Sequence, residues 1–278
     1  MTTVAVLGAG GLGAAMARRL GAEGHDVRLW NRSADKARAV ADGADGVTAY
    51  DEATEAVRGA DALLTVLRDA DVVAEVVSPL LGDVSGVWVQ ASTVGPAGAE
   101  RLGSLAAEAG VDYLDAPVSG STQPAEQGKL LWLVAGQDSA VERARPVLDA
   151  LGSVQQVGTG TSGGSALKLA VNAWLTIATV GISDVLDLAD GLGVDHDDLR
   201  SALEAGPLSM PYAQMKSNLM DAGSYEPGFA VANALKDLHL AADSHAPSPL
   251  LAEVAARLAR TVEDGHGEAD VAAVHRTR

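Results

Sequence analysis

The sequence contains no cysteine, few aromatic residues and far fewer cationic than anionic side chains. Its 278 residues include 20 Lys and Arg against 37 Asp and Glu, a formal net charge of −17, and only 3% aromatics. Without cysteine there can be no disulfide framework, thiolate nucleophile or cysteine-ligated metal centre, so redox chemistry requires a bound cofactor. The negative charge argues against nucleic acid or an anionic membrane as partner, since both select clustered Lys and Arg.

Long hydrophobic runs and a secretory signal are also lacking. The longest uncharged apolar stretch, residues 169–183, contains Asn172 and is shorter than the roughly 20 residues of a membrane span. The first residues run straight into an apolar strand pattern, with no basic region or small-residue cleavage site. We therefore expect a cytoplasmic protein in which residues 169–183 belong to a buried helix.

The two halves of the chain differ in their hydrophobic periodicity. In the first half, short β-branched runs alternate with helical patterns, which is typical of βαβ units on a parallel sheet. The expected strands are residues 4–7, 27–30, 62–66, 87–90, 112–114, 130–134 and 154–157. A glycine-rich stretch, residues 158–164, separates this half from a second half with helical patterns only.

The second half begins with one long apolar pattern that predicts a helix over residues 166–191. Further helices are expected over residues 194–203, 229–245 and 249–263. Residues 206–225 contain two prolines and two glycines and are expected to be irregular. The predicted fold is an α/β Rossmann-type N-terminal domain, residues 1–161, followed by an all-α C-terminal domain, residues 162–278, built on a long interdomain helix.

A glycine-rich turn follows the first expected strand. It has the sequence Gly8-Ala9-Gly10-Gly11-Leu12-Gly13, which satisfies G-x-G-x-x-G at the start of a helix. In this pattern the first glycine permits the tight turn, the second lets the backbone approach a pyrophosphate, and the third lets helix and strand pack closely. Free N–H groups at the helix N-terminus favour the phosphates. The turn predicts a dinucleotide site.

The end of the second strand indicates which dinucleotide is preferred. Asn31, Arg32 and Ser33 stand there, with Arg28 before them and Lys36 after. An acidic residue would accept a hydrogen bond from an unmodified ribose 2′-OH, whereas a guanidinium and a hydroxyl suit a 2′-phosphate. We therefore expect NADP(H) in preference to NAD(H).

Two further segments offer groups for chemistry. Ser119, Gly120 and Ser121 follow a strand whose carboxyl end should line the ligand crevice, and their hydroxyl and N–H groups suit a carboxylate, although an ordinary turn is the alternative. Lys168 and Asn172 are four residues apart and therefore share a helix face. Burial would lower the pKa of Lys168 towards the range useful for proton transfer, although a lysine reaching the surface from an amphipathic helix is the alternative.

These segments together resemble the β-hydroxyacid dehydrogenases, the group that contains 3-hydroxyisobutyrate dehydrogenase, tartronate semialdehyde reductase and the glyoxylate/succinic semialdehyde reductases. The resemblance runs nearly end to end. Its motifs are Gly8-Ala9-Gly10-Gly11-Leu12-Gly13, Ala91-Ser92-Thr93-Val94, Asp115-Ala116-Pro117-Val118-Ser119-Gly120, Lys168-Leu169-Ala170-Val171-Asn172 and Lys236-Asp237-Leu238.

The resemblance implies a 6-phosphogluconate dehydrogenase-like plan with an active site between the two domains. It implies that Lys168 is the catalytic lysine and that Asn172 helps to orient it. It further implies that Ser119 and Gly120 hold the substrate carboxylate, to which Ser121 adds a hydroxyl that the family pattern lacks. Leu67 and Thr93 correspond to family positions near the nicotinamide, and Lys236 to a lysine that faces cofactor and substrate.

Some positions depart from the family pattern. Ser162 stands in place of a glycine before the lysine, Arg68 in place of a proline after Leu67, and Ser121 in place of a glycine. Trp132 and Trp174 are large for their positions. These departures bear on which substrate is used.

The resulting expectation is a reductase that uses NADPH to interconvert a small carboxylate-bearing aldehyde or keto acid and its hydroxy acid, with Lys168 as general acid and base. The alternatives are an NADPH-dependent imine reductase and a non-catalytic NADP-binding sensor. The six histidines show no metal-binding spacing, so no metal is expected. The long apolar helix favours a homodimer.

Overall fold

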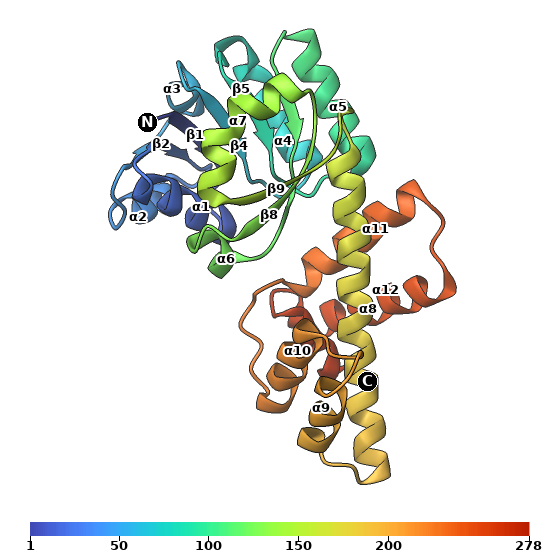
Figure 1. Cartoon of the computed structure of the whole chain (residues 1–278). Coiled ribbons are helices and arrows are strands. Elements are labelled where there is room, and N and C mark those ends of the chain that lie inside the picture. Colours follow the sequence, from blue (N-terminus) through green and yellow to red (C-terminus); the bar gives the residue numbers. More distant parts are fainter. Residues whose placement is uncertain (278) are drawn as a thin grey trace. The chain divides into compact units, whose positions relative to one another are not determined.

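The computed structural model describes residues 1–277, which form two compact units (Figure 1). The first unit runs from Met1 to Lys168 and the second begins at Leu169. One helix, α8 (Gly163–Leu192), contributes residues to both units. The two units are described separately below.

The first unit is built on a nine-stranded sheet. Its order is β3-β2-β1-β4-β5-β6-β8-β7, with β9 also paired to β8. The strands are β1 (Thr3–Leu7), β2 (Asp26–Trp30), β3 (Val47–Tyr50), β4 (Ala62–Thr65), β5 (Val87–Gln90), β6 (Tyr113–Asp115), β7 (Val118–Ser119), β8 (Leu130–Ala135) and β9 (Gly152–Gly158). The pairs from β3 through β6 are all parallel, which is the doubly wound arrangement.

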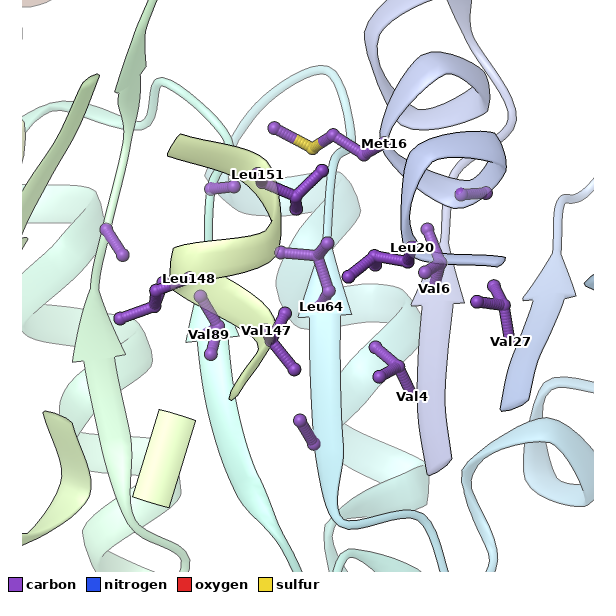
Figure 2. Packing of buried hydrophobic residues seen from close by; sticks show 14 of the residues in the cluster. Val4, Val6, Met16, Leu20, Val27, Leu64, Val89, Val147, Leu148 and Leu151 are labelled. Atoms are coloured by element: carbon purple, nitrogen blue, oxygen red, sulfur yellow. The ribbon is translucent and has the colours of Figure 1, made fainter. Parts of the chain in front are cut away.

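Helices cover both faces of this sheet. They are α1 (Gly11–Ala22), α2 (Ala34–Ala41), α3 (Ala53–Val57), α4 (Ala70–Val77), η1 (Ser78–Asp83), α5 (Gly95–Glu108), α6 (Thr122–Glu126) and α7 (Asp138–Leu151). Because side chains alternate along a strand, Val4 and Val6 of β1 pack with α1 and α7, while Ala5 and Leu7 pack with α4 and α5. Figure 2 shows the α1 and α7 side of this core.

The sequence prediction of this sheet was incomplete. Strands β3 and β7 were not predicted, because only one of the four residues of β3 is buried, whereas β4 and β5 have the same length but are buried throughout, and β7 has only two residues. The last part of the sheet is mixed, since β8 runs antiparallel to both β6 and β7 but parallel to β9. β8 can reverse direction because the segment that precedes it contains only the short α6 rather than a full crossover helix.

The second unit is helical. Besides α8 it contains α9 (His196–Glu204), α10 (Pro211–Ala222), α11 (Val231–Ser244), α12 (Pro249–Thr261), a π-helical turn η2 (Val262–His266) and a short helix η3 (Val271–Arg276). Its core includes Leu186, Val231, Val254, Leu258 and Val274. The predicted fold class, an α/β Rossmann-type domain followed by an all-α region on a long helix, is confirmed.

One expectation about the second unit was wrong. Residues 206–225 are not irregular throughout, because α10 occupies most of this stretch. Pro211 starts the helix, where its missing N–H costs nothing, and Gly223 ends it with a positive φ of 61°. Pro211 and Gly223 therefore mark the two ends of a helix and do not interrupt it.

Helix α8 has the length and composition of a membrane span, yet it is a core helix. In its most apolar 18-residue window, 44% of residues are buried within the protein. Its buried face carries the polar residues Asn172, Thr176, Thr179 and Ser183, whose side chains hydrogen-bond within the second unit.

Candidate active site

The glycine-rich loop between β1 and α1 has a shape that only glycine permits. Gly8 has φ +121°, and a Cβ atom there would lie 2.2 Å from the carbonyl oxygen of Val66. A Cβ on Gly13 would lie 2.1 Å from the carbonyl oxygen of Gly8. A Cβ on Gly10, by contrast, would meet no atom within 4 Å.

The loop therefore leaves open space at the start of α1. Gly11 and Leu12 form the first turn of this helix, and no side chain caps its N-terminus. The amide groups of the first turn are consequently available to an anion, and the helix dipole favours negative charge at this end. The loop fits the pyrophosphate of a dinucleotide.

Asn31, which directly follows β2, supports this loop. Its Oδ1 accepts a hydrogen bond from the Ala9 amide at 3.0 Å, and its Nδ2 donates to the Ser33 carbonyl oxygen at 3.0 Å. The side chain thus connects the glycine-rich loop to the turn after β2. The sequence placed Asn31 beside the cofactor but did not indicate that its amide fixes the loop.

The turn after β2 also presents a cation. Arg32 and Ser33 are exposed, and the Ser33 hydroxyl does not cap α2. Arg38, in the following helix, is paired with Asp35 and Asp51 at 2.9 and 2.6 Å. Within residues 1–277, no carboxylate pairs with Arg32, so its guanidinium can receive an external anion.

A buried polar network fixes the loops after β4 and β5. The Leu67 amide donates to Ser92 Oγ at 2.8 Å, and the Ser92 amide donates to Gln90 Oε1 at 2.8 Å. Gln90 Nε2 donates to the Ser92 carbonyl oxygen at 2.9 Å, and Thr65 Oγ1 lies 3.4 Å from Gln90 Oε1. The network holds the backbone at Leu67 and next to Thr93. The sequence motif contained Ser92 but gave no sign of this role.

The segment Ser119-Gly120-Ser121 lies at the end of β7. Gly120 has φ +128°, and a Cβ there would lie 2.7 Å from Leu130 Cδ2, so the turn requires glycine. Ser121 precedes α6, and its side chain does not cap that helix. Ser119 and Ser121 are partly buried, while Gly120 is exposed.

Lys168 lies in the second turn of α8, whose start is attached to the sheet. The Asp115 carboxylate at the end of β6 accepts hydrogen bonds from the Ser165 amide at 2.7 Å and from Ser165 Oγ at 2.6 Å. Burial raises the pKa of Asp115 to about 6, although hydrogen bonds from Ser165 and Gly164 act to lower it. Lys168 is partly buried.

In the second unit, Asp237 connects two residues that the sequence singled out. Its Oδ2 accepts a hydrogen bond from Asn172 Nδ2 at 2.6 Å, and its Oδ1 lies 2.8 Å from Lys236 Nζ. Asn172 and Asp237 are buried, whereas Lys236 is partly exposed. The motif Lys236-Asp237-Leu238 contained this aspartate, but the sequence did not give it a role.

The structure brings most predicted site residues of the first unit to one edge of the sheet. The glycine-rich loop, the turn at Asn31, Leu67 and Thr93 follow β1, β2, β4 and β5, which are parallel and therefore share a carboxyl edge. The start of α8 joins this edge through Asp115 at the end of β6. No group of three or more metal-ligating side chains occurs among residues 1–277.

Two family models together match almost the whole chain. Residues 3–160 match the NAD binding domain of 6-phosphogluconate dehydrogenase, and residues 162–277 match the NAD-binding region of NADP-dependent 3-hydroxyisobutyrate dehydrogenase. A probable 3-hydroxyisobutyrate dehydrogenase of Mycobacterium tuberculosis is 31% identical, over 100% of this chain and 98% of the relative. Glyoxylate/succinic semialdehyde reductase 1 of Arabidopsis thaliana is 29% identical, over 98% of this chain and 96% of the relative.

Solved structures agree with these matches. A structure of Mycobacterium tuberculosis 3-hydroxyisobutyrate dehydrogenase with L-serine is similar at a TM-score of 0.89 and 29% identity, covering 100% of this chain and 99% of the other. An imine reductase of Myxococcus stipitatus shares the fold at a TM-score of 0.68 and 19% identity, covering 100% and 99% of the two chains. The chain belongs to the β-hydroxyacid dehydrogenase family and is an NAD(P)-dependent oxidoreductase that acts on CH–OH groups.

Proposed function

We propose that this enzyme uses NADP(H) to interconvert a small carboxylate-bearing aldehyde or keto acid and the matching hydroxy acid. The observation that carries the proposal is the attachment of the start of α8, three residues before Lys168, to the sheet edge that also bears the glycine-rich loop. Relatives named for 3-hydroxyisobutyrate, L-serine and 2-(hydroxymethyl)glutarate support the substrate class, since each of these compounds has a carboxylate and a hydroxyl group.

The chain's own residues supply binding and proton transfer. When bound, the reduced nicotinamide supplies a hydride to the carbonyl carbon. Lys168, as an ammonium group, stabilises the negative charge that develops on the carbonyl oxygen and donates a proton to it, and in the reverse direction neutral Lys168 accepts that proton. Asn172 orients the lysine. Ser119, Gly120 and Ser121 hold the substrate carboxylate, and Lys236 contributes a second cation towards cofactor and substrate.

The same proposal assigns the cofactor-binding residues. They are Gly8, Ala9, Gly10, Gly11, Leu12, Gly13, Asn31, Arg32, Ser33, Leu67, Thr93 and Lys236. Arg32, which pairs with no carboxylate among residues 1–277, and the Ser33 hydroxyl favour NADP(H) through its 2′-phosphate. An NAD-dependent L-serine dehydrogenase of Pseudomonas aeruginosa is also a relative, at 29% identity, so the preference needs its own test. Arg32→Ala should weaken NADPH binding and leave NADH binding unchanged, as measured by nicotinamide fluorescence.

The function is tested by the loss of nicotinamide absorbance. Purified enzyme with NADPH is offered succinic semialdehyde, glyoxylate, tartronate semialdehyde, methylmalonate semialdehyde and a cyclic imine. We expect turnover of an acid-bearing carbonyl, and Lys168→Ala should lower kcat by about 10²- to 10⁴-fold with NADPH binding retained. The matched control is Lys129→Ala, which removes an exposed lysine of the first unit and should turn over at the parental rate.

The other outcomes separate the alternatives. Turnover of the imine that survives in Lys168→Ala would indicate an imine reductase. Tight NADPH binding with no turnover of any compound would indicate a sensor.

We further propose that the enzyme is a cytoplasmic homodimer without a nucleic-acid or membrane partner. The exposed face of α8 carries Trp174, Val185, Leu188 and Leu192, at spacings that place them along one stripe of the helix. A second copy of this chain would cover such a stripe. Light scattering should give twice the chain mass of 28.2 kDa, and Leu188→Lys should shift the protein towards the monomer.

A further inference from the structure

A buried carboxylate next to the candidate site has no part in the proposed chemistry. Asp115 is fully buried at the end of β6, whereas acidic residues are rarely buried unless they are paired. No ion pair involves Asp115 among the described residues 1–277; its partners are uncharged groups of α8. Such a carboxylate needs an explanation, because its charge is costly to bury.

The contact of Asp115 with α8 uses both carboxylate oxygens. Oδ2 accepts the Ser165 amide at 2.7 Å, and Oδ1 accepts the Ser165 hydroxyl at 2.6 Å. A Cβ on Gly164 would lie 2.2 Å from the Leu133 carbonyl oxygen and 2.6 Å from the Asp115 carbonyl oxygen. The start of α8 is therefore seated against β6 and β8 with no room to shift inwards.

This contact determines where the next turn of α8 lies. Lys168 follows Ser165 by three residues, so the two side chains are neighbours on one helix face, about 4.5 Å apart along the axis. Asp115 is also four residues before Ser119, and both residues pair with β8, Asp115 opposite Ala135 and Ser119 opposite Leu131. One carboxylate thus links the strand that leads to the proposed carboxylate-binding turn with the helix that carries Lys168.

We propose that Asp115 is a positioning residue, which fixes the start of α8 so that Lys168 is held over the carboxyl edge of the sheet. The inference rests on the proposed role of Lys168 and deepens it. Asp115 touches neither substrate nor cofactor in this scheme. Its effect on turnover passes through the orientation of the lysine, which requires a definite geometry for proton transfer.

The energetics support a role beyond stability. Burial raises the pKa of Asp115 to about 6, so the fold holds its charged form at neutral pH at a cost in free energy. A neutral side chain of the same shape would avoid that cost. The carboxylate does, however, match two donors at once, and the N-terminus of a helix favours its charge.

The test compares Asp115→Asn, Ser165→Ala and Ser165→Thr in the full-length enzyme. Asparagine keeps the shape but presents an NH₂ group to one of the two donors, and Ser165→Thr keeps the hydroxyl that Ser165→Ala removes. The readouts are kcat, KM for the substrate and the dissociation constant of NADPH, with Tm measured to show that each variant is folded. Asp112→Asn is the matched control, since Asp112 is an exposed partner of Arg143 just before the same strand.

We expect Asp115→Asn to lower kcat by about tenfold to a hundredfold while the NADPH dissociation constant stays within twofold. Ser165→Thr should keep more activity than Ser165→Ala, and Asp112→Asn should be parental. In a Lys168→Ala background, Asp115→Asn should cause little further loss, because the group through which it acts is gone.

Two results would overturn the proposal. One is a kcat for Asp115→Asn within twofold of the parent. The other is that Asp115→Asn lowers kcat by the same factor in the parent and in the Lys168→Ala background. If Asp115→Asn does not fold, equal activities of Ser165→Ala and Ser165→Thr overturn the proposal instead. Parental turnover by Lys168→Ala alone would contradict the proposed function itself, so the two failures are distinguishable.

Discussion

Asn172 and Asp237 are buried together, with the Asn172 amide nitrogen 2.6 Å from Asp237 Oδ2. Asn172 stands on α8 and Asp237 on α11, so the hydrogen bond joins the two helices that carry the site residues of the second unit. The other oxygen of Asp237 faces the Lys236 ammonium group at 2.8 Å. One carboxylate therefore sets both the rotamer of the amide and the position of the lysine.

Asp237→Asn should disturb both of these groups. The substitution removes the charge that Lys236 faces and places an amide beside Asn172, so at least one buried donor loses its acceptor, at a cost of about 1–3 kcal/mol. When this cost raises the free energy of the transition state, kcat/KM falls by roughly tenfold to a hundredfold. Steady-state kinetics would measure it. Asp243→Asn, at an exposed position of the same helix, is the control, and equal rates for the two variants would contradict the assignment.

Asn31→Ala should weaken NADPH and NADH binding equally. The side chain holds the glycine-rich loop through the Ala9 amide, and losing such a hydrogen bond costs about 1 kcal/mol, or roughly fivefold in affinity. Fluorescence titration with both cofactors measures the ratio of the two dissociation constants, which should stay constant. A change in that ratio would mean that Asn31 contacts the ribose or its 2′-phosphate directly, as Arg32 is proposed to do.

Lys216→Met should destabilise the second unit strongly. Lys216 and Asp270 form an ion pair at 2.7 Å, with side chains only 3% and 1% exposed. Removing one partner leaves the other charge buried, which costs about 3–5 kcal/mol. Urea unfolding should show this loss, whereas Lys129→Met, at an exposed site, should change the free energy of unfolding by less than about 0.5 kcal/mol. If Lys216→Met lowers the free energy of unfolding by less than about 1 kcal/mol, the ion pair contributes little to stability.

The stability of the second unit should also depend on His196. A hydrogen bond with Asp221 at 2.7 Å raises the pKa of His196, with further support from the charges of Asp221 and Asp190. The folded protein thus favours the imidazolium form of His196. The contribution of this group to the free energy of unfolding is complete below about pH 6.5, the ordinary pKa of histidine, and is lost as the pH rises through the folded-state pKa. Tm should therefore fall at low salt as the pH rises from about 6.5 through the raised pKa of His196. His196→Asn should flatten this dependence, whereas a control at the exposed His245 should not.

Features with a strong local pattern could be predicted from the sequence. The glycine-rich loop was identified because Gly8 and Gly13 have steric roles that recur in every such turn. The long helix was predicted over residues 166–191 and found over Gly163–Leu192, since apolar periodicity over many turns is hard to mistake. The edge strand β3 has a single buried residue and so lacks the continuous apolar run that made β4 and β5, of the same length, predictable.

The supporting contacts could not be predicted, because they join residues far apart in the chain. Asp115 and Ser165 are 50 positions apart, and Asn172 and Asp237 are 65 apart. Each aspartate lay within a recognised motif, but its partner depends on how β6 meets α8, or α8 meets α11. The sequence thus indicated Lys168 and Asn172 and gave no sign that Asp115 and Asp237 hydrogen-bond to the helix that carries these two residues.

The continuity of α8 constrains the length of the chain as well as its residues. Ser165, Lys168 and Asn172 are placed by counting along one helix, and the boundary between the compact units falls just after Lys168. A single residue inserted between Lys168 and Asn172 would turn everything downstream by about 100° around the helix axis. Recombination between relatives can therefore exchange the two halves here only when the residue count is kept, and alignments of homologues should show no gap across this turn.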